Sequence, residues 1–174
     1  MRSDAETVEV VLAGQREAFA DLVRRYEGAV HAVAMGVLCN HHAAQDVCQE
    51  TFVAAYKGLA TLRQPSSFGS WIVRIARNQA LSFIQRKPTE QPLGELPEVP
   101  AHQGNGRLDE SAQHLLAAVM ELPVHERAVV LLRYFAGHSL EQISEMTGRS
   151  VGTIGAQLHR ARARLRERIE GVTP

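Results

Sequence analysis

Apolar side chains recur every three or four residues through much of the first 86 residues, which is the spacing of one buried helix face. The pattern predicts helices over residues 17–38, 43–59 and 67–86. No run alternates apolar and polar residues over the length of a strand. Because isolated helices of this length are marginally stable, we expect the three to pack into one helical bundle.

The helical spacing returns after residue 110. Helices are predicted over residues 111–121 and 124–136, with Pro123 suited to the first turn of the second and Gly137 to its end. Ser139 with Gln142 three residues later has the spacing of a capping box, so a third helix is expected to begin there.

A glycine separates this third helix from a fourth. Gly148 suits the left-handed backbone of a tight turn, and Ser150 can cap the helix that follows. The positions expected to be buried in the fourth helix are Val151, Ile154, Leu158 and Leu165. Two helices around a glycine turn, with basic residues outward, are typical of a helix-turn-helix that binds the DNA major groove. An ordinary helix pair with solvated arginines fits the same pattern.

Residues 88–108 interrupt the helical pattern. They contain four of the seven prolines and three glycines, which disfavour regular structure. We therefore predict an all-α protein of two small domains, residues 1–87 and 109–174, joined by a flexible linker over residues 88–108.

The amino-acid composition excludes several classes of protein. The 174 residues carry 19 basic and 19 acidic side chains, so the chain does not coat nucleic acid by bulk charge. The charge is nevertheless uneven, because residues 149–168 hold six arginines against Glu167 alone. Two cysteines without a Cys-x-x-Cys spacing indicate a reduced, cytoplasmic protein. No apolar run reaches bilayer length, and the acidic start is unlike a signal peptide.

No pattern of catalytic residues stands out. The sequence has no glycine-rich phosphate loop, nucleophile elbow or His-Glu-x-x-His motif, so we predict no catalytic residues. Cys39, His41, His42 and Cys48 are zinc-ligand types, but their spacing fits no finger signature. We therefore expect neither a metal nor a cofactor.

Several stretches in fixed order resemble the extracytoplasmic-function (group IV) sigma factors of the sigma-70 family. The C-terminal stretches are Leu122-Pro123, Leu131-Leu132-Arg133-Tyr134, Ser139 to Ser144, Ser150 to Ile154 and Leu158 to Arg162. The N-terminal stretches are Ala18 to Tyr26, Asp46 to Phe52 and Phe68 to Asn78. They resemble regions 4 and 2 of that family, respectively. The similarity covers nearly all of residues 15–168.

The resemblance implies a docking surface for core RNA polymerase. In the family, the segment matching Asp46 to Phe52 docks the clamp coiled coil of the β′ subunit. The residues that the resemblance assigns to this surface are Asp46, Gln49, Glu50 and Val53. Asp46 and Glu50 also read as a solvated acidic pair, but like charges at this spacing repel slightly, which favours a basic partner.

The resemblance also implies that the loop over residues 61–67 captures a base of the single-stranded −10 promoter element, with the next helix on the adjoining DNA. The expected −10 contacts are Arg63, Gln64, Ser66, Arg74, Arg77, Asn78, Arg86 and Lys87. Arginines and lysines there would bind phosphates, and the loop would discriminate the base. Trp71 could stack on a base, but its spacing from Phe68 and Ile75 favours a core position.

The fourth helix of the C-terminal half would read the −35 element. Its expected contacts are Arg149, Ser150, Thr153, Gln157, His159, Arg160, Arg162 and Arg164. Gly155, Ala156 and Gln157 stand where family members commonly carry a basic residue, Ser and Arg. Each good bidentate base contact is worth about 1–3 kcal/mol of discrimination. The departure predicts weak −35 reading, or reading of a different sequence.

These observations together predict a sigma factor and no enzymatic activity. The implied partners are core RNA polymerase, through its β′ clamp and β flap, and promoter DNA. An anti-sigma factor or a DNA-bound recruiter would be a further partner. The alternative is a stand-alone helix-turn-helix regulator, which would not need the N-terminal region. Membrane insertion is not expected.

Overall fold

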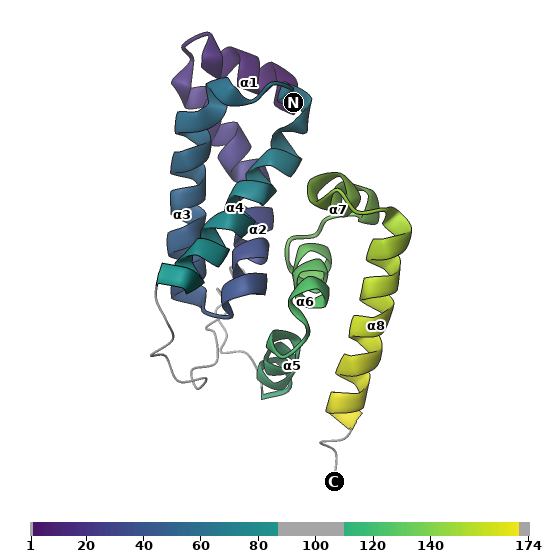
Figure 1. The fold of residues 1–174 in the computed structure, drawn as a ribbon. Coiled ribbons are helices and arrows are strands. Elements are labelled where there is room, and N and C mark those ends of the chain that lie inside the picture. Colours follow the sequence, from purple (N-terminus) through teal and green to yellow (C-terminus); the bar gives the residue numbers. More distant parts are fainter. Residues whose placement is uncertain (1, 87–109, 171–174) are drawn as a thin grey trace.

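The computed structural model describes residues 2–86 and 110–170, which form two helical lobes (Figure 1). The N-lobe, residues 2–86, contains α1 (Asp4–Leu12), α2 (Phe19–Leu38), α3 (His41–Gly58) and α4 (Phe68–Arg86). The C-lobe, residues 110–170, contains α5 (Glu110–Met120), α6 (Val124–Val130), α7 (Leu140–Thr147) and α8 (Val151–Glu170). The described ranges contain no strand, so the predicted all-α fold is confirmed. The predicted linker, residues 88–108, lies outside them.

The N-lobe is a bundle in which α2, α3 and α4 pack against one another. Their predicted apolar faces meet in a core that includes the fully buried Leu22, Val47, Phe68 and Ile72. No helix was predicted over residues 4–12, where the structure has α1. Ser3 and Glu6 cap that helix reciprocally, and its Val8 and Val11 are buried.

A tight turn joins α2 to α3 and sets the angle between them. Cys39 takes the left-handed conformation, with φ of 52°, and its N–H bonds the carbonyl of Met35. The Asn40 side chain then accepts a 2.9 Å hydrogen bond from the N–H of Ala43, so α3 begins two residues before the predicted start. An asparagine cap satisfies a donor that the first helical turn leaves free.

The C-lobe confirms the predicted helix ends. Ser139 and Gln142 form the capping box of α7, and Gly148 closes that helix with φ of 68°. The predicted helix over residues 124–136 is α6 followed by a π-helical turn, η4 (Leu131–Phe135). On α8, Ile154 and Leu158 are buried as predicted, whereas Val151 is 39% exposed because it lies in the first turn, at the helix tip.

The two lobes pack on each other. α2 of the N-lobe lies against α6 and η4 of the C-lobe, and α4 lies against α7 (Figure 1). α8 lies on the far side of the C-lobe, where it packs on α5, α6 and α7. The helix-turn-helix therefore has one helix against the N-lobe and the other on the outer side.

Candidate nucleic-acid and protein-binding surfaces

The outer face of α3 carries the four residues predicted to bind a protein partner. Asp46, Gln49 and Glu50 are exposed, and Val53 is 53% exposed. Their spacing of three, four and seven residues places them on one side of the helix. The opposite side of α3, with Val47, faces the core. The structure thus brings these four residues together as a mixed acidic and apolar surface.

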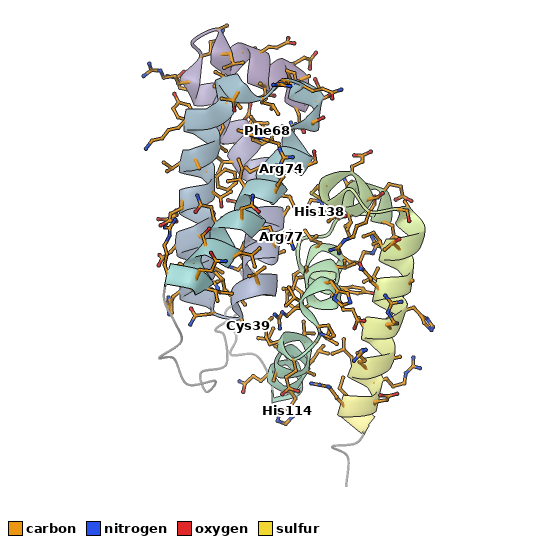
Figure 2. All side chains as sticks on the ribbon, viewed as in Figure 1. Cys39, Phe68, Arg74, Arg77, His114 and His138 are labelled. Atoms are coloured by element: carbon orange, nitrogen blue, oxygen red, sulfur yellow. The ribbon has the colours of Figure 1, made fainter. Side chains whose placement is uncertain are left out.

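A second exposed face follows α4. Arg74, Arg77 and Asn78 are exposed, while Ile72 and Ala76 of the same helix face the core. Arg86 is exposed in the last turn of α4, and Lys87 lies outside the described residues. Figure 2 shows Arg74 and Arg77 on the stretch of α4 beside the C-lobe, in the same part of the molecule as His138. Two guanidinium groups and an amide in one row suit contacts to a phosphate backbone.

The loop before α4 presents the remaining predicted −10 residues. Arg63, Gln64 and Ser66 are exposed, and Pro65–Ser67 form a short 3-10 turn that packs beside α1. The buried Phe68 anchors the loop where α4 begins. The side chains of Arg63, Gln64 and Ser66 are therefore accessible to a ligand, while Phe68 holds the loop that carries them in place.

The start of α4 needs glycine at position 69. A Cβ there would lie 2.8 Å from Oη of Tyr26, whose hydroxyl bonds the carboxylate of Asp4. Burial raises the pKa of Tyr26, and the hydrogen bond to Asp4 raises it further.

Trp71 lies half-buried against Phe68, with ring centroids 5.9 Å apart, as its predicted core position requires.

The N-terminal tip of α8 exposes two hydroxyl groups. Ser150 Oγ accepts a 3.2 Å hydrogen bond from the N–H of Thr153, and the two hydroxyl oxygens lie 2.9 Å apart. Both residues are exposed, and so is His159 further along α8. These three predicted −35 residues lie at the surface, as a groove contact requires.

Gln157 does not lie where the sequence analysis expected it. The side chain is buried, with 7% of the residue exposed, and its Oε1 accepts a 3.3 Å hydrogen bond from Nη1 of Arg149. The prediction that Gln157 faces outward is therefore wrong. The physical reason is helix periodicity, which places Gln157 on the face of α8 that buries Ile154, Leu158 and Ala161.

Two of the arginines predicted to contact the −35 element are engaged within the C-lobe. Nε of Arg160 lies 3.4 Å from Oε1 of Glu126, and Nε of Arg164 lies 3.2 Å from Oε2 of the same carboxylate. The Glu126 side chain is 2% exposed, so its charge needs these partners. Glu126 was not among the predicted site residues, and no local signal marks it, because its arginine partners lie more than thirty residues later.

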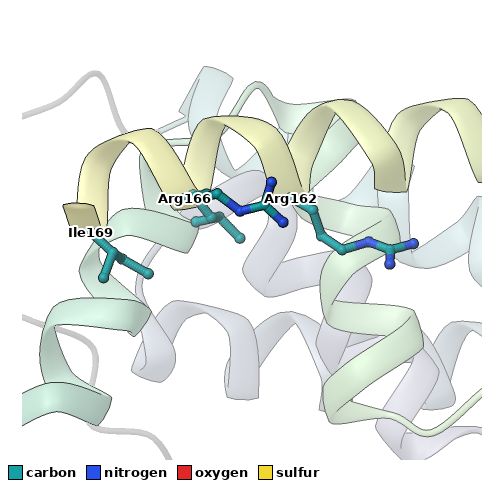
Figure 3. Close-up of a pocket in the computed structure, with 4 residues that line it drawn as sticks. Arg162, Arg166 and Ile169 are labelled. Atoms are coloured by element: carbon teal, nitrogen blue, oxygen red, sulfur yellow. The ribbon is translucent and has the colours of Figure 1, made fainter. Parts of the chain in front are cut away.

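Arg162 points away from this cluster. It is exposed and lines a shallow apolar hollow with Leu165, Arg166 and Ile169 near the end of α8 (Figure 3). Arg168, one turn after Arg164, pairs with Glu121, which directly follows α5. The arginines of α8 are therefore divided between those that hold the helix on the lobe and those that remain outward.

The cysteine and histidine residues near the α2–α3 turn do not assemble into a ligand set. Within residues 2–86 and 110–170, no group of three or more acidic, His or Cys side chains could hold a metal ion. Burial raises the pKa of Cys48 to about 11, which disfavours the thiolate that metals bind. None of the helices described combines the length and apolarity needed to cross a bilayer.

Comparison with known families gives two matches that cover most of the chain. Residues 22–88 match Sigma-70 region 2, and residues 112–165 match Sigma-70 region 4. The chain is 32% identical to the ECF RNA polymerase sigma factor SigM of Mycobacterium tuberculosis, over 94% of this chain and 83% of that protein. It is 29% identical to SigW of Bacillus subtilis, over 93% of this chain and 94% of that protein.

Two solved structures share the fold. CnrH, solved in complex with the cytosolic domain of CnrY, superimposes with a TM-score of 0.70 at 23% identity, over 99% of this chain and 100% of that chain. The sigma factor RpoE of Bartonella quintana, solved with the anti-sigma factor NepR, gives a TM-score of 0.66 at 24% identity, over 90% and 98% of the two chains. At these identities the likeness concerns the helical fold.

Proposed function

The chain belongs to the ECF group of the sigma-70 family of RNA polymerase sigma factors, and from that membership we propose how its two lobes share promoter recognition. Residues 1–87 dock on core RNA polymerase and read the −10 element. Residues 109–174 bind the −35 element, with residues 88–108 as the tether. The observation that carries the proposal is the presence of both family regions, in order, in one chain.

Docking on the β′ clamp uses Asp46, Gln49, Glu50 and Val53. Support comes from their common exposed face on α3, where an apolar side chain stands beside two carboxylates. In interfaces of this kind, apolar contacts supply buried area, and charged pairs set how the two partners are aligned. The acidic pair then finds a basic partner that relieves its repulsion.

Reading of the −10 element uses the loop of Arg63, Gln64 and Ser66 for an unstacked base. Arg74, Arg77, Asn78 and Arg86 follow the adjacent strand, together with Lys87. The row of exposed guanidinium groups supports this assignment, because phosphate contacts supply affinity without sequence information. An unstacked base presents its hydrogen-bonding edge to the polar loop.

Reading of the −35 element is weak and depends on a partner for part of its specificity. Of the eight predicted contacts, Gln157 is turned inward and Arg160 and Arg164 are paired with Glu126. Ser150, Thr153, His159 and Arg162 remain outward, along with a small-residue stretch at Gly155-Ala156. A DNA-bound recruiter would replace missing base contacts by raising the local concentration of the protein.

The protein acts by binding and catalyses no reaction itself. Its partners are core RNA polymerase, through the β′ clamp and β flap, and promoter DNA, so it works in the cytoplasm. An anti-sigma factor would act by covering the same surfaces. A stand-alone helix-turn-helix regulator is disfavoured, since such a protein needs no Sigma-70 region 2, which matches residues 22–88 here.

Run-off transcription with purified core RNA polymerase and a random promoter library tests the proposal. We expect selected promoters to share a −10 motif, with a less defined −35 motif. Substituting each base of the −35 region in turn then measures how much that base contributes to transcription. Single substitutions that lower output more than about tenfold, or 1.4 kcal/mol per position, would show strong −35 reading. No promoter-specific transcript would contradict the sigma factor activity itself.

A further inference from the structure

The C-lobe holds Arg149 at two points, just before α8 begins. Oγ of Ser144 on α7 donates a 2.6 Å hydrogen bond to the carbonyl oxygen of Arg149. Nη1 of the Arg149 guanidinium donates a 3.3 Å hydrogen bond to Oε1 of Gln157 on α8. The backbone and the far end of this side chain are therefore both fixed, at the turn where α7 meets α8 (Figure 1).

Gln157 lies where packing alone would favour an apolar residue. It is 7% exposed, and it shares the inner face of α8 with the buried Ile154, Leu158 and Ala161. A buried amide costs free energy unless it is hydrogen-bonded, whereas an apolar side chain of the same length would fill this space without that cost. The contribution of the amide is therefore its hydrogen bond to Arg149.

The partner of Arg149 is neutral, which sets this arginine apart from its neighbours on α8. Arg160 and Arg164 both face the carboxylate of Glu126, so their charges are balanced within the lobe. Among the described residues, no ion pair includes Arg149. An amide oxygen orients the guanidinium without neutralising it. Arg149 consequently keeps its full positive charge in a fixed position, on a side chain that is only partly buried.

The surroundings of Arg149 favour an anion. The N-terminal end of a helix carries a partial positive charge, which acidic residues in the first turn commonly offset. α1 has Asp4 and Glu6 in its first turn and α7 has Glu141, but the first turn of α8 has no acidic residue. A fixed guanidinium beside this uncompensated end is repelled in the free protein. Binding of an anion would relieve the repulsion.

We propose that Arg149 binds a phosphate of the DNA backbone, and that Gln157 is a positioning residue that holds the Arg149 guanidinium for this contact. The proposal rests on the proposed function, in which the C-lobe binds the −35 element. A long side chain that is already ordered loses less conformational entropy on binding. A phosphate contact fixes the alignment of the protein on the duplex and carries no sequence information, which agrees with weak base reading.

Removal of the amide tests the role of Gln157. Gln157→Met keeps the length of the buried side chain and removes the acceptor for Arg149. Fluorescence anisotropy of the full-length protein on a labelled duplex of random sequence should show binding weakened by about three- to tenfold. The salt slope of log K should not change, because no charge is lost. Arg149→Ala should weaken binding further and reduce that slope by about 1.

A double-mutant cycle distinguishes positioning from a structural role. Combined with Arg149→Ala, Gln157→Met should cause no further loss of DNA affinity, because the side chain that it orients is gone. Combined with Arg162→Ala, it should cause the same loss as in the parent protein, since Arg162 is an exposed arginine outside this pair. An equal loss in both backgrounds would show that Gln157 only supports the lobe, and no loss in the parent protein would overturn the proposal as well.

A second variant keeps the hydrogen bond and changes the charge. Gln157→Glu has nearly the same shape, but it places a carboxylate on the Arg149 guanidinium. We expect the salt slope to fall by about 1, as in Arg149→Ala, with the helical content retained in circular dichroism. This variant decides the question if Gln157→Met does not fold. A salt slope equal to that of the parent protein would overturn the proposal.

The outcome is separable from that of the proposed function. Anisotropy on a random duplex needs neither polymerase nor a promoter, so it measures the coupling of Arg149 and Gln157 directly. A parent protein that yields no promoter-specific transcript contradicts the proposed function. A parent protein that transcribes, but whose Arg149→Ala variant binds the duplex as tightly as the parent, contradicts this proposal alone.

Discussion

Nε of Arg164 lies 3.2 Å from Oε2 of Glu126, so a carboxylate that is almost wholly enclosed is neutralised by the outermost helix of the C-lobe. Arg160 approaches the other oxygen of the same carboxylate from one turn earlier. Glu126 thereby fixes the rotation of α8 on α6. The cluster determines which α8 side chains face outward, although none of its members needs to contact DNA.

Removal of the Glu126 charge should destabilise the C-lobe. We expect Glu126→Gln to lower the free energy of unfolding by about 1–3 kcal/mol, because the buried carboxylate loses its ion pairs with Arg160 and Arg164, whose half-exposed side chains can hydrate. Urea unfolding followed by circular dichroism measures the change. Glu167→Gln, an exposed acid on α8, is the control and should remain within about 0.5 kcal/mol of the parent protein.

Two arginines of α8 should respond differently to truncation. Arg162→Ala should weaken DNA binding uniformly across sequences and reduce the salt slope of log K by about 1, since an outward guanidinium is free to bind a phosphate. Arg160→Ala should chiefly lower stability, because it releases Glu126. Fluorescence anisotropy at several salt concentrations measures the slopes. Equal slopes for both variants would contradict the division of the arginines.

Charge reversal on α3 should abolish polymerase binding. We expect Asp46→Lys/Glu50→Lys to lose co-purification with core RNA polymerase while retaining its helicity, because both side chains are exposed and none of the core is altered. Glu9→Lys/Glu17→Lys makes the same change of charge at exposed positions away from α3. Retained binding by the first variant, or equal loss by the second, would refute the docking surface.

Acidification should destabilise the fold through His31, whose ring lies against that of His41 on α3. Burial lowers the pKa of His31 below 6.5, and the neighbouring His41 adds to the effect. The folded state then binds fewer protons than the unfolded state, so stability is complete above about pH 6.5 and is lost as the pH falls toward the folded pKa. His31 lines a groove of about 650 Å³ between α2 and α3 on one side and α5 and η4 on the other. The other polar side chains of this groove all come from the N-lobe and are Glu27, His41, Gln45, Cys48 and Gln49, with apolar residues opposite.

Unfolding free energies at pH 7.5 and 5.5 measure this contribution. Because the ring is only half-buried, we expect His31→Gln to reduce the loss on acidification by less than about 1 kcal/mol. Some pH dependence of the unfolding free energy should remain in this variant, since burial also lowers the pKa of His138. His114→Gln, an exposed site on α5, should behave like the parent protein. An identical pH dependence in His31→Gln would exclude His31 as the source.

The small residues of α8 allow a gain of DNA affinity. An added Cβ at Gly155 meets no atom within 4 Å, so Gly155→Arg should be accommodated and should strengthen DNA binding. Gln157→Arg should instead destabilise the C-lobe by about 1–3 kcal/mol, because it places a second guanidinium beside Arg149 in a buried site. Anisotropy and urea unfolding on both variants distinguish the two outcomes.

Local signals predicted the helices and their ends well. The Ser139–Gln142 capping box and the left-handed Gly148 lie where the sequence placed them, because each depends on residues within one turn. The Ser3–Glu6 capping box is an equally local signal for α1, a helix that was not predicted. The family resemblance also came from the sequence alone, since it rests on short stretches in a fixed order.

The sequence by itself therefore determined the helical class, the helix-turn-helix and the exposed rows on α3 and α4, whose spacing follows from helix periodicity. Only the tertiary structure decided that Arg160 and Arg164 serve Glu126, and that Gly36 meets Ala128. Each of these depends on how one element packs against another. A periodic pattern gives the face of a helix but not the side chain that an element distant in sequence brings to it.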